Sequence, residues 1–188
     1  MFPQVIGLSG KIGVGKTTAG MIIQQRGLAD RLLAFGDPVK EEAAWRFGFD
    51  LALCYEDKDR IILHQDLPGG AMSVRSILQW WGTDVRRAED PLYWVQRMED
   101  WLGQMDAERV VIHDVRFREE ALWIREVGGR LYQIRPYPEW QPGQEAGHRS
   151  ETDLDDWEDW DGVIQPPYQE LDLVAQMVAW DLSIETAK

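Results

Sequence analysis

The stretch Gly10-Lys11-Ile12-Gly13-Val14-Gly15-Lys16-Thr17 decides the fold, because it is a complete G-x-x-x-x-G-K-[ST] phosphate-binding loop. The apolar run Val5-Ile6-Gly7-Leu8 comes directly before it and predicts a buried strand. Residues 17–25 follow it and predict a helix. A strand, a glycine-rich loop and a helix in this order are the setting in which such a loop binds phosphate, so the sequence predicts a nucleoside triphosphate site. The alternative is a glycine-rich turn without a ligand.

The chemistry of the loop follows from its residue types. Three glycines let consecutive backbone N–H groups converge on the β- and γ-phosphates, at a helix N-terminus whose partial positive charge attracts anions. Lys16 is expected to reach the β- and γ-phosphate oxygens, and the Thr17 hydroxyl is expected to hold Mg²⁺.

Length and composition predict one globular domain. The 188 residues fit a single domain with a sizeable core, and 44% hydrophobic with 28% charged residues is ordinary for a globular enzyme. No apolar run approaches the roughly 20 residues that span a bilayer, and residues 1–4 lead into the first strand without a signal-peptide pattern, so a cytoplasmic location is expected. Cys54 is the single cysteine, which excludes an internal disulfide and a cysteine-based zinc site.

The charge distribution argues against a polymeric nucleic acid as partner. The net charge is −13, whereas binding along a phosphate backbone needs a basic face. Residues 151–161 hold seven of the acidic residues, and we interpret this run as a solvated segment in preference to a metal site. Most of the ten tryptophans, such as Trp45 and Trp123, fall in helical patterns and are interpreted as core or helix-packing residues.

Strand and helix signals alternate along the chain and predict an α/β fold with a mostly parallel sheet. Asp37 is expected to cap the second helix, at the C-terminal end of a strand, where open α/β sheets bind ligands. Residues 48–72 are weakly patterned and are expected to form a loop-rich insertion before Ser73 caps the next helix. The expected strands are residues 5–8, 31–35, 109–114, 130–135 and 162–164, and the expected helices are 17–25, 38–47, 74–87, 91–105, 117–127 and 169–182.

Two further features indicate phosphate chemistry. The run Arg109-Val110-Val111-Ile112-His113-Asp114 is an apolar strand that ends in an acid, as in the Walker-B strand of P-loop proteins. Arginines in or beside predicted loops and helix ends suggest a second phosphate, because a guanidinium binds phosphate oxygens bidentately. Each of them taken alone fits a surface ion pair as well. They are Arg75, Arg87, Arg116, Arg118, Arg135 and Arg149.

The chain resembles the phage-type deoxynucleoside monophosphate kinases, within the P-loop nucleoside monophosphate kinase group, over most of its length. Trp94 and the segment Asp161 to Leu173 also match that family. Four motifs beyond the P-loop carry the resemblance in the right order: Phe35-Gly36-Asp37-Pro38-Val39-Lys40, similar to F-[AG]-D-P-[LV]-K; Arg75 to Arg87, similar to R-x-x-L-Q-x-x-G-T-[DE]-x-x-R; Asp114-Val115-Arg116-Phe117-Arg118-Glu119-Glu120, similar to D-V-R-F-x-x-E; and His148-Arg149-Ser150-Glu151, similar to H-x-S-E.

The resemblance implies a P-loop NTPase fold of three α/β/α layers around a mostly parallel five-stranded sheet. It also implies one kinase domain with a helical acceptor-binding region at about 37–107 and a lid at about 136–160. The implied activity is ATP-dependent phosphoryl transfer to a deoxynucleoside 5′-monophosphate, giving the diphosphate, with ATP and Mg²⁺ as cofactors. The partners would be small nucleotides, without a membrane, and a homodimer is possible. The setting would be the cytoplasm of a virus-infected host.

The resemblance also implies roles for individual residues. Catalysis would fall to Lys16, Asp37, Arg116, Arg118 and Arg149. The metal would be held by Thr17, Asp37 and Asp114. ATP would be bound by Gly10, Lys11, Gly13, Val14, Gly15, Lys16, Thr17 and Thr18. The acceptor would be bound by Asp37, Lys40, Arg75, Gln79, Thr83, Arg87 and Trp94. Asp37 as a plain helix cap, and the residues of 75–87 as a solvent-facing helix surface, are the alternatives.

The sequence departs from the family pattern in three places, which concern the choice of acceptor more than the reaction. Arg118-Glu119 replaces a common Pro-Asn, Arg86 stands where a small residue is common, and Trp80-Trp81 is bulky beside the expected base pocket.

Other functions stay open on the sequence. A different phosphorylated acceptor such as dephospho-coenzyme A is one alternative, and a nucleotide-binding switch or ATPase without a second substrate is another. No N-K-x-D guanine-reading motif occurs, and Asp57-Lys58-Asp59 is a weak partial echo of it.

Overall fold

The computed structural model describes residues 2–137, 141, 149–167 and 170–186. It divides the chain into two compact units, each described here by itself. The sheet unit comprises Met1–Ala34 and Leu102–Lys188, and the helical unit comprises Phe35–Trp101.

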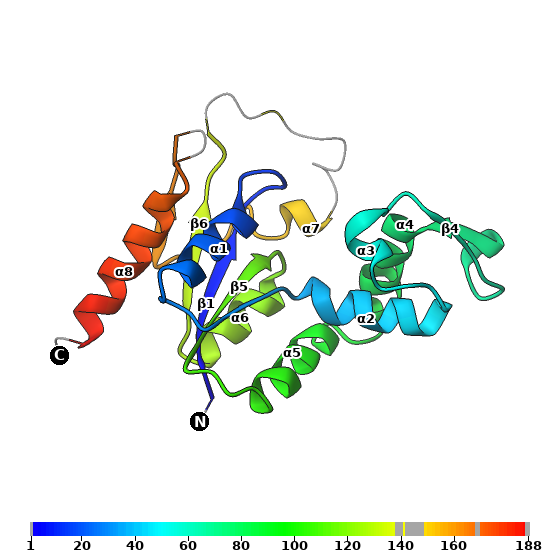
Figure 1. Cartoon of the computed structure of the whole chain (residues 1–188), viewed down its shortest axis with the longest axis horizontal. Helices are drawn as coiled ribbons and strands as arrows, with labels where there is room; N and C mark the ends of the chain where they lie inside the picture. The colour runs from blue at the N-terminus through cyan, green and yellow to red at the C-terminus, as the bar shows by residue number, and fades with distance from the viewer. Residues whose placement is uncertain (1, 138–140, 142–148, 168–169, 187–188) are drawn as a thin grey trace. The chain divides into compact units, whose positions relative to one another are not determined.

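The sheet unit contains the predicted parallel sheet (Figure 1). All pairings are parallel and the strand order is β2-β5-β1-β6-β7. Because both faces of the sheet are covered, β1, β5 and β6 are almost continuously apolar, and that is why the sequence marked them so clearly. The strands are β1 Gln4–Ser9, β2 Arg31–Leu33, β5 Arg109–Val115, β6 Arg130–Ile134 and β7 Gly162–Ile164.

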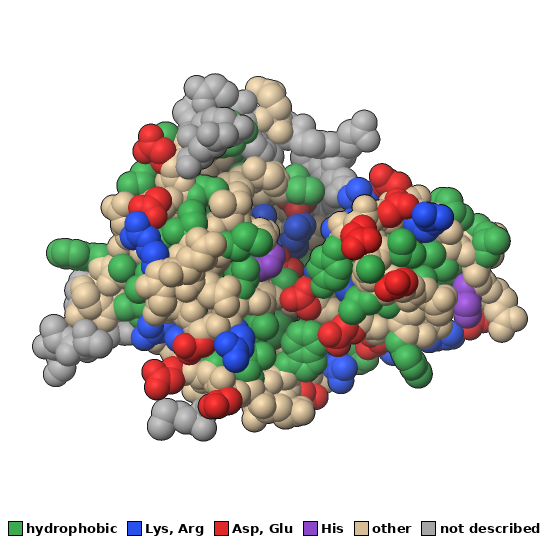
Figure 2. Space-filling view, in the orientation of Figure 1, with side chains coloured by type: hydrophobic (Ala, Val, Ile, Leu, Met, Phe, Trp, Pro, Cys, Tyr) green, Lys and Arg blue, Asp and Glu red, His purple; other side chains and the backbone are tan. Residues whose placement is uncertain are grey.

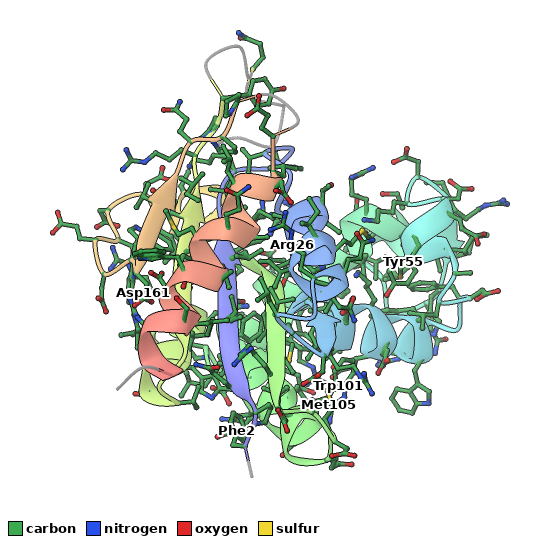
Figure 3. The ribbon with its side chains drawn as sticks, turned by 60° about the vertical axis from the view of Figure 1, so that its left-hand side comes forward. Phe2, Arg26, Tyr55, Trp101, Met105 and Asp161 are labelled. Carbon is green, nitrogen blue, oxygen red and sulfur yellow. The ribbon has the colours of Figure 1, made fainter. Side chains whose placement is uncertain are left out.

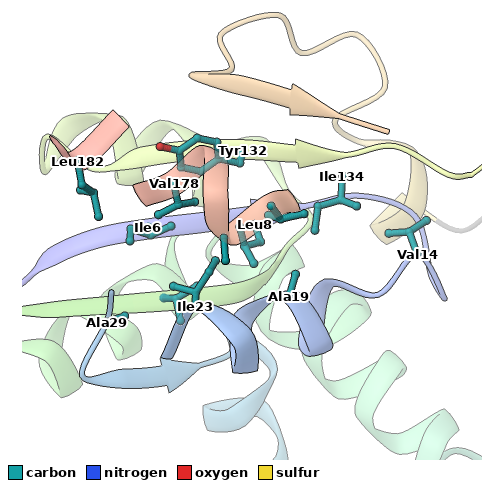
Figure 4. Close-up of a cluster of buried hydrophobic side chains, with 13 residues drawn as sticks. Ile6, Leu8, Val14, Ala19, Ile23, Ala29, Tyr132, Ile134, Val178 and Leu182 are labelled. Atoms are coloured by element: carbon teal, nitrogen blue, oxygen red, sulfur yellow. The ribbon is translucent and has the colours of Figure 1, made fainter. Parts of the chain in front are cut away.

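Helices lie on both faces of this sheet, so the three-layer α/β/α prediction is confirmed. Helix α1 (Lys16–Gln25) and helix α8 (Asp172–Thr186) cover one face and share a core with β1, β5 and β6 (Figure 4). Helix α6 (Arg118–Glu126) covers the other face, where Ile124 lies against Gly7 of β1. Ile6 and Leu8 join the α1/α8 core because successive side chains of a strand point to opposite faces.

Polar contacts of Asp161 connect β6 to helix α6. Asp161, labelled in Figure 3, accepts hydrogen bonds from the Leu131 backbone N–H at 2.7 Å and from the guanidinium groups of Arg125 and Arg130 at 2.6 and 3.0 Å. A side chain of the acidic run therefore joins β6 to α6. Acidic side chains are also spread over the face drawn in Figure 2, and the net charge of the chain is −13.

The helical unit has its own apolar core, formed by Ala43, Phe47, Leu67, Ile77, Trp81 and Trp94. Two short strands form an antiparallel hairpin in which Ile62 pairs with Met72. A π-helix, Trp80–Arg87, continues α4 without interruption. The elements are α2 Gly36–Phe47, α3 Leu53–Glu56, β3 Ile61–Leu63, a 3₁₀ turn Pro68–Gly70, β4 Ala71–Ser73, α4 Val74–Gln79, the π-helix and α5 Tyr93–Gly103.

Several boundaries differ from the prediction. Helix α2 begins at Gly36 with Phe35 in the N-cap position, so the expectation that Asp37 caps it is wrong. Asp37 instead lies in the first turn, where its negative charge still favours the helix dipole. Ser73 does cap α4, since its hydroxyl accepts the Ser76 backbone N–H at 3.2 Å.

The segment 48–72 is more ordered than the expected loop-rich insertion. It contains α3, β3 and the beginning of β4. Strands β3 and β4 have three residues each, too few to show an alternating pattern, and they lie in a weakly patterned segment, so only their tertiary pairing identifies them.

The two tryptophans that were predicted to be core or helix-packing residues, Trp123 and Trp45, differ in their burial. Trp123 is 5% exposed, as predicted, but Trp45 is 82% exposed and the prediction for it is wrong. Helix α2 buries Ala43, Ala44 and Phe47, and Trp45 falls on the other side of the helix.

The helical unit, Phe35–Trp101, nearly coincides with the predicted helical region at 37–107. That both units act as one kinase domain stays a prediction. The expected lid at 136–160 lies partly outside the described residues, including His148. Its described part contains α7 (Arg149–Thr152). Among the described helices, none combines the length and apolar character needed to cross a membrane.

Candidate active site

The phosphate-binding loop joins β1 to α1, and its glycines at positions 10, 13 and 15 all have positive φ. Gly10 has φ 146° and Gly15 has φ 94°, a region that residues with a Cβ rarely adopt. A Cβ on Gly10 would lie 2.3 Å from the Ile134 carbonyl oxygen, and one on Gly15 would lie 2.4 Å from Leu171 Cδ1. The motif glycines are thus needed for both backbone conformation and close packing.

Lys16 is held over this loop. It is the first residue of α1, is 7% exposed, and its Nζ donates to the carbonyl oxygens of Gly10 at 2.6 Å and Lys11 at 2.8 Å. Burial, together with the nearby Arg116 charge, lowers the pKa of Lys16 from 10.5 to about 8. A cation that has lost this much hydration is stabilised by a polyanion, which is what a triphosphate supplies.

The Thr17 hydroxyl has a partner that the sequence analysis missed. Thr17 Oγ1 lies 3.1 Å from His113 Nδ1 in β5. Adjacent strand residues point to opposite faces, so His113 rather than Asp114 lies on the face that carries α1. The alternation of side chains along the strand is the sequence signal that could have identified His113 as a neighbour of Thr17.

The residues present fit a magnesium ion. Among the described residues, no cluster of three or more His, Cys, Asp and Glu side chains could hold a metal ion unaided. Mg²⁺ is commonly held by one or two protein oxygens, waters and substrate phosphates, so the Thr17 hydroxyl could bind the ion directly and Asp114 could bind it through water. Asp114 is near enough to Lys16 for its charge to raise the pKa of that amine, against the larger effect of burial.

The three arginines of this unit that are expected to take part in catalysis are all paired with carboxylates. Arg116 pairs with Glu151, and Arg118 pairs with Asp156. Arg149 Nε lies 3.1 Å from Asp153 Oδ1. The acidic run 151–161 is therefore not simply solvated: Glu151 is 7% exposed as a residue, and the run supplies counter-charges to the candidate phosphate ligands.

A pocket opens beside the loop, at the carboxyl ends of β1, β5 and β6. Ligands of open α/β sheets bind at this end of the strands. Basic side chains line it together with the backbone of the loop and the start of the acidic run. The lining residues that matter here are Gly10, Lys11, Arg116, Gln133, Arg135 and Glu151.

The residues expected to bind the acceptor belong to the helical unit, where two of them form one group. Asp37 Oδ1 accepts a hydrogen bond from Lys40 Nζ at 2.8 Å and lies 3.4 Å from the Tyr55 hydroxyl. Lys40 Nζ also lies 4.5 Å from the centroid of the Tyr55 ring. An aromatic ring beside a paired lysine and aspartate can bind a polar, flat ligand, although no sequence motif marks Tyr55.

The other acceptor candidates differ in exposure. Arg75 and Gln79 are exposed, and Arg75 Nε lies 3.4 Å from Asp59 Oδ1. Thr83 is half-buried in the π-helix, a conformation that is frequent at functional sites. Arg87 is 5% exposed, and its Nη1 donates to the Pro91 carbonyl at 3.4 Å.

Trp94 has a packing role. It is 1% exposed, and its Nε1 donates to the Gly82 carbonyl at 2.8 Å. It therefore supports the π-helix from the core and has no surface on which a ligand could stack.

The unusual Arg86 has a structural explanation. Its guanidinium carbon lies 4.6 Å from the Trp81 ring centroid and 4.8 Å from that of Tyr93. Its Nε donates to Glu42 Oε1 at 2.7 Å, and the Trp81 indole and the Tyr93 hydroxyl donate to the same carboxylate at 3.0 and 2.5 Å. Arg86 thus packs against two aromatic rings of the helical unit and neutralises Glu42. A small residue at this position would leave Glu42 without this cation.

Comparison with known proteins gives a solved structure that shares the fold of this chain. No protein-family model matches the chain. Shikimate kinase from Aquifex aeolicus vf5 superposes with a TM-score of 0.50 and 16% sequence identity, covering 98% of this chain and 99% of the other. Shikimate kinase from Bacteroides thetaiotaomicron and the APS kinase CysC of Mycobacterium tuberculosis give TM-scores of 0.43 and 0.42, with 11% and 14% identity. Each of these two superpositions covers 96% of this chain, and they cover 98% and 97% of the two other chains, respectively.

The parallel sheet, the phosphate-binding loop and its buried lysine define a P-loop nucleotide-binding protein, and the relative described next identifies it as a kinase, that is, a phosphotransferase. A curated protein of Acanthamoeba polyphaga mimivirus named "Putative deoxynucleotide monophosphate kinase" is 30% identical over 177 residues, covering 85% of this chain and 86% of its own length. The chain belongs to the deoxynucleotide monophosphate kinase family.

Proposed function

We propose that the protein transfers the γ-phosphoryl group of ATP to a deoxynucleoside 5′-monophosphate and so forms the diphosphate and ADP. The observation that carries the proposal is the presence of two cations beside the phosphate-binding loop: Lys16, which is buried at the end of the loop, and Arg116, which lines the adjoining pocket and whose charge lowers the pKa of Lys16. Each charge disfavours the other in the absence of a ligand, so the site is suited to a strongly anionic one. The name of the mimivirus relative supports a deoxynucleotide as acceptor.

The donor half of the reaction would fall to the sheet unit. Backbone N–H groups of residues 10–18 would bind the β- and γ-phosphates, and Lys16 would neutralise the charge that develops on the transferring group. Thr17 and Asp114 would hold Mg²⁺, which would supply further neutralisation of the phosphate charge when bound. Arg118 and Arg149 would exchange their carboxylate partners for phosphate oxygens, and Arg116 would bind phosphate while it keeps its contact with Glu151.

The acceptor half would fall to the helical unit. Arg75 and Arg87 would bind the monophosphate, and the Gln79 amide would offer a donor and an acceptor to the base edge. Thr83, Asp37 and Lys40 would complete the site, with Trp94 as its support from the core. An acceptor phosphate is already ionised near neutral pH, so catalysis requires positioning and charge neutralisation without a dedicated general base.

The test is ADP release with MgATP against dGMP, dTMP, dCMP, dAMP and their ribose counterparts, with dephospho-coenzyme A as a further acceptor. We expect strong stimulation by one or a few deoxynucleotides. Stimulation by dephospho-coenzyme A alone, or ADP release that ignores every acceptor, would contradict the proposal and favour another metabolite kinase or a nucleotide switch. The Lys16→Ala variant, prepared in the same way, controls for contaminating kinases.

A further inference from the structure

Glu151 is a buried carboxylate beside the phosphate-binding loop. Its side chain is 3% exposed, although it belongs to the four-residue helix α7 and begins the acidic run. A carboxylate removed from water to this extent is destabilising unless cations and hydrogen-bond donors surround it.

Both oxygens of this carboxylate have partners on segments distant in the sequence. Oε2 accepts the backbone N–H of Ile12, in the phosphate-binding loop, at 2.7 Å. Oε1 pairs with the Arg116 guanidinium, directly after β5. The Glu151 backbone carbonyl accepts a hydrogen bond from Lys11 Nζ. One residue therefore connects the loop to the arginine that is expected to act on the transferring phosphoryl group.

The charge of Glu151 also acts on the catalytic lysine. It raises the pKa of Lys16, whereas burial and the Arg116 charge lower it by more. Glu151 thus offsets part of the repulsion between Lys16 and Arg116, two cations that the same phosphate would attract. Without this carboxylate, the like charges would favour a wider separation of the two side chains.

We propose that Glu151 is a positioning residue of the phosphate site, which fixes the loop through the Ile12 amide and orients Arg116 for phosphoryl transfer. The Arg116 part rests on the proposed function. The Ile12 part concerns nucleotide binding alone and can be tested whatever the acceptor is.

The Glu151→Gln variant separates the two contacts. Its amide oxygen can still accept the Ile12 N–H, but its NH₂ group cannot pair with a guanidinium. We expect kcat with the preferred acceptor to fall about 10- to 100-fold, because small misplacements of a catalytic group have effects of this order. The KM for the acceptor should change less than about threefold, since Glu151 touches none of the residues expected to bind it.

A matched control is Asp159→Asn, which removes the same charge from the same acidic run. Asp159 is 72% exposed and pairs with Arg125, outside the proposed phosphate site. Its kcat should stay within about twofold of wild type, because exposed ion pairs contribute little. An equal loss of activity in both variants would attribute the effect to net charge and overturn the proposal.

A double variant tests whether Glu151 acts through Arg116. In an Arg116→Ala background, Glu151→Gln should lower kcat by less than about threefold, because the group it orients is already absent. Losses that multiply as independent effects would contradict the proposal.

Nucleotide binding supplies the second readout. By calorimetry, Glu151→Ala should raise the Kd for MgADP about threefold to tenfold, the effect of one hydrogen bond, whereas Glu151→Gln should stay within about twofold. If wild type phosphorylates no nucleotide, the proposed function fails while this comparison still decides the role of Glu151. Unchanged MgADP affinity in Glu151→Ala would contradict the proposed role of the Glu151–Ile12 contact in nucleotide binding. Thermal unfolding checks the fold, and Glu151→Asp, in which one contact must lengthen, replaces Glu151→Ala if that variant does not fold.

Discussion

The Thr17 hydroxyl oxygen lies 3.1 Å from Nδ1 of His113. A hydroxyl that binds a metal through its oxygen must direct its proton elsewhere, and a neutral imidazole with its hydrogen on Nε2 can accept that proton at Nδ1. We therefore expect His113 to orient Thr17 for Mg²⁺ in the proposed reaction.

The first prediction compares His113→Leu with His113→Asn. Leucine removes the acceptor, so the Mg²⁺ concentration for half-maximal activity should rise about threefold to tenfold, the effect of one lost hydrogen bond. Asparagine keeps an acceptor near the same place and should recover most of the loss. The affinity for ADP measured with and without Mg²⁺ gives a check independent of turnover. If both variants require the wild-type Mg²⁺ concentration, His113 has a packing role only.

The second prediction concerns pH and Lys16. Its pKa is lowered to about 8 in the free protein, so the ammonium loses its proton as the pH rises through this value. Because kcat/KM reports ionisations of the free enzyme, kcat/KM for MgATP should decrease above pH about 8. Bound phosphates favour the charged amine, so the corresponding fall in kcat should occur at higher pH. A kcat/KM profile that stays flat to pH 10 would contradict this role. The Lys16→Ala variant should lose most transfer activity while it remains folded, as thermal unfolding would report.

The third prediction concerns Arg87 and the acceptor. A guanidinium that binds a phosphate contributes about 1.5–3 kcal/mol, so Arg87→Ala should raise the acceptor KM roughly 10- to 100-fold. The KM for ATP should change much less. Because Arg87 is 5% exposed, Arg87→Lys serves as a variant that better preserves the fold. Equal increases in both KM values would remove Arg87 from the acceptor site.

The fourth prediction concerns the polar cluster of the helical unit. Glu42 accepts hydrogen bonds from Arg86, Trp81 and Tyr93, and its own side chain is 12% exposed. Glu42→Gln removes the charge that Arg86 faces, so the free energy of unfolding should decrease by about 1–3 kcal/mol. The neighbouring Glu41 is exposed, and Glu41→Gln should change stability by less than about 0.5 kcal/mol. Denaturant unfolding of both variants would measure this difference.

The fifth prediction separates two tryptophans by their position. Trp94→Ala should lower the free energy of unfolding by about 3–5 kcal/mol, because it empties a core site and removes the bond to Gly82. Trp45→Ala should change it by less than about 0.5 kcal/mol, since that side chain is 82% exposed. Similar losses in both variants would mean that Trp45 has a partner in solution.

The sequence by itself determined the sheet, the phosphate-binding loop and the family. Strands β1, β5 and β6 are local apolar runs, and the loop is a contiguous motif whose glycines are required by its own backbone path. Signals of this kind depend on neighbouring residues, and they could be identified without coordinates. Even β7, Gly162–Ile164, lies where it was predicted.

Only the tertiary structure decided which side chains meet. Glu151 reaches Ile12 across 139 positions and His113 reaches Thr17 across 96, and no local pattern encodes either pairing. The hairpin of β3 and β4, the exposure of Trp45 and the burial of Trp94 likewise depend on which faces the packing covers. The physical reason is that the burial of a side chain depends on distant segments that pack against it. From its composition the acidic run was predicted to be solvated, whereas in the folded chain Glu151 is buried against cations beside the loop.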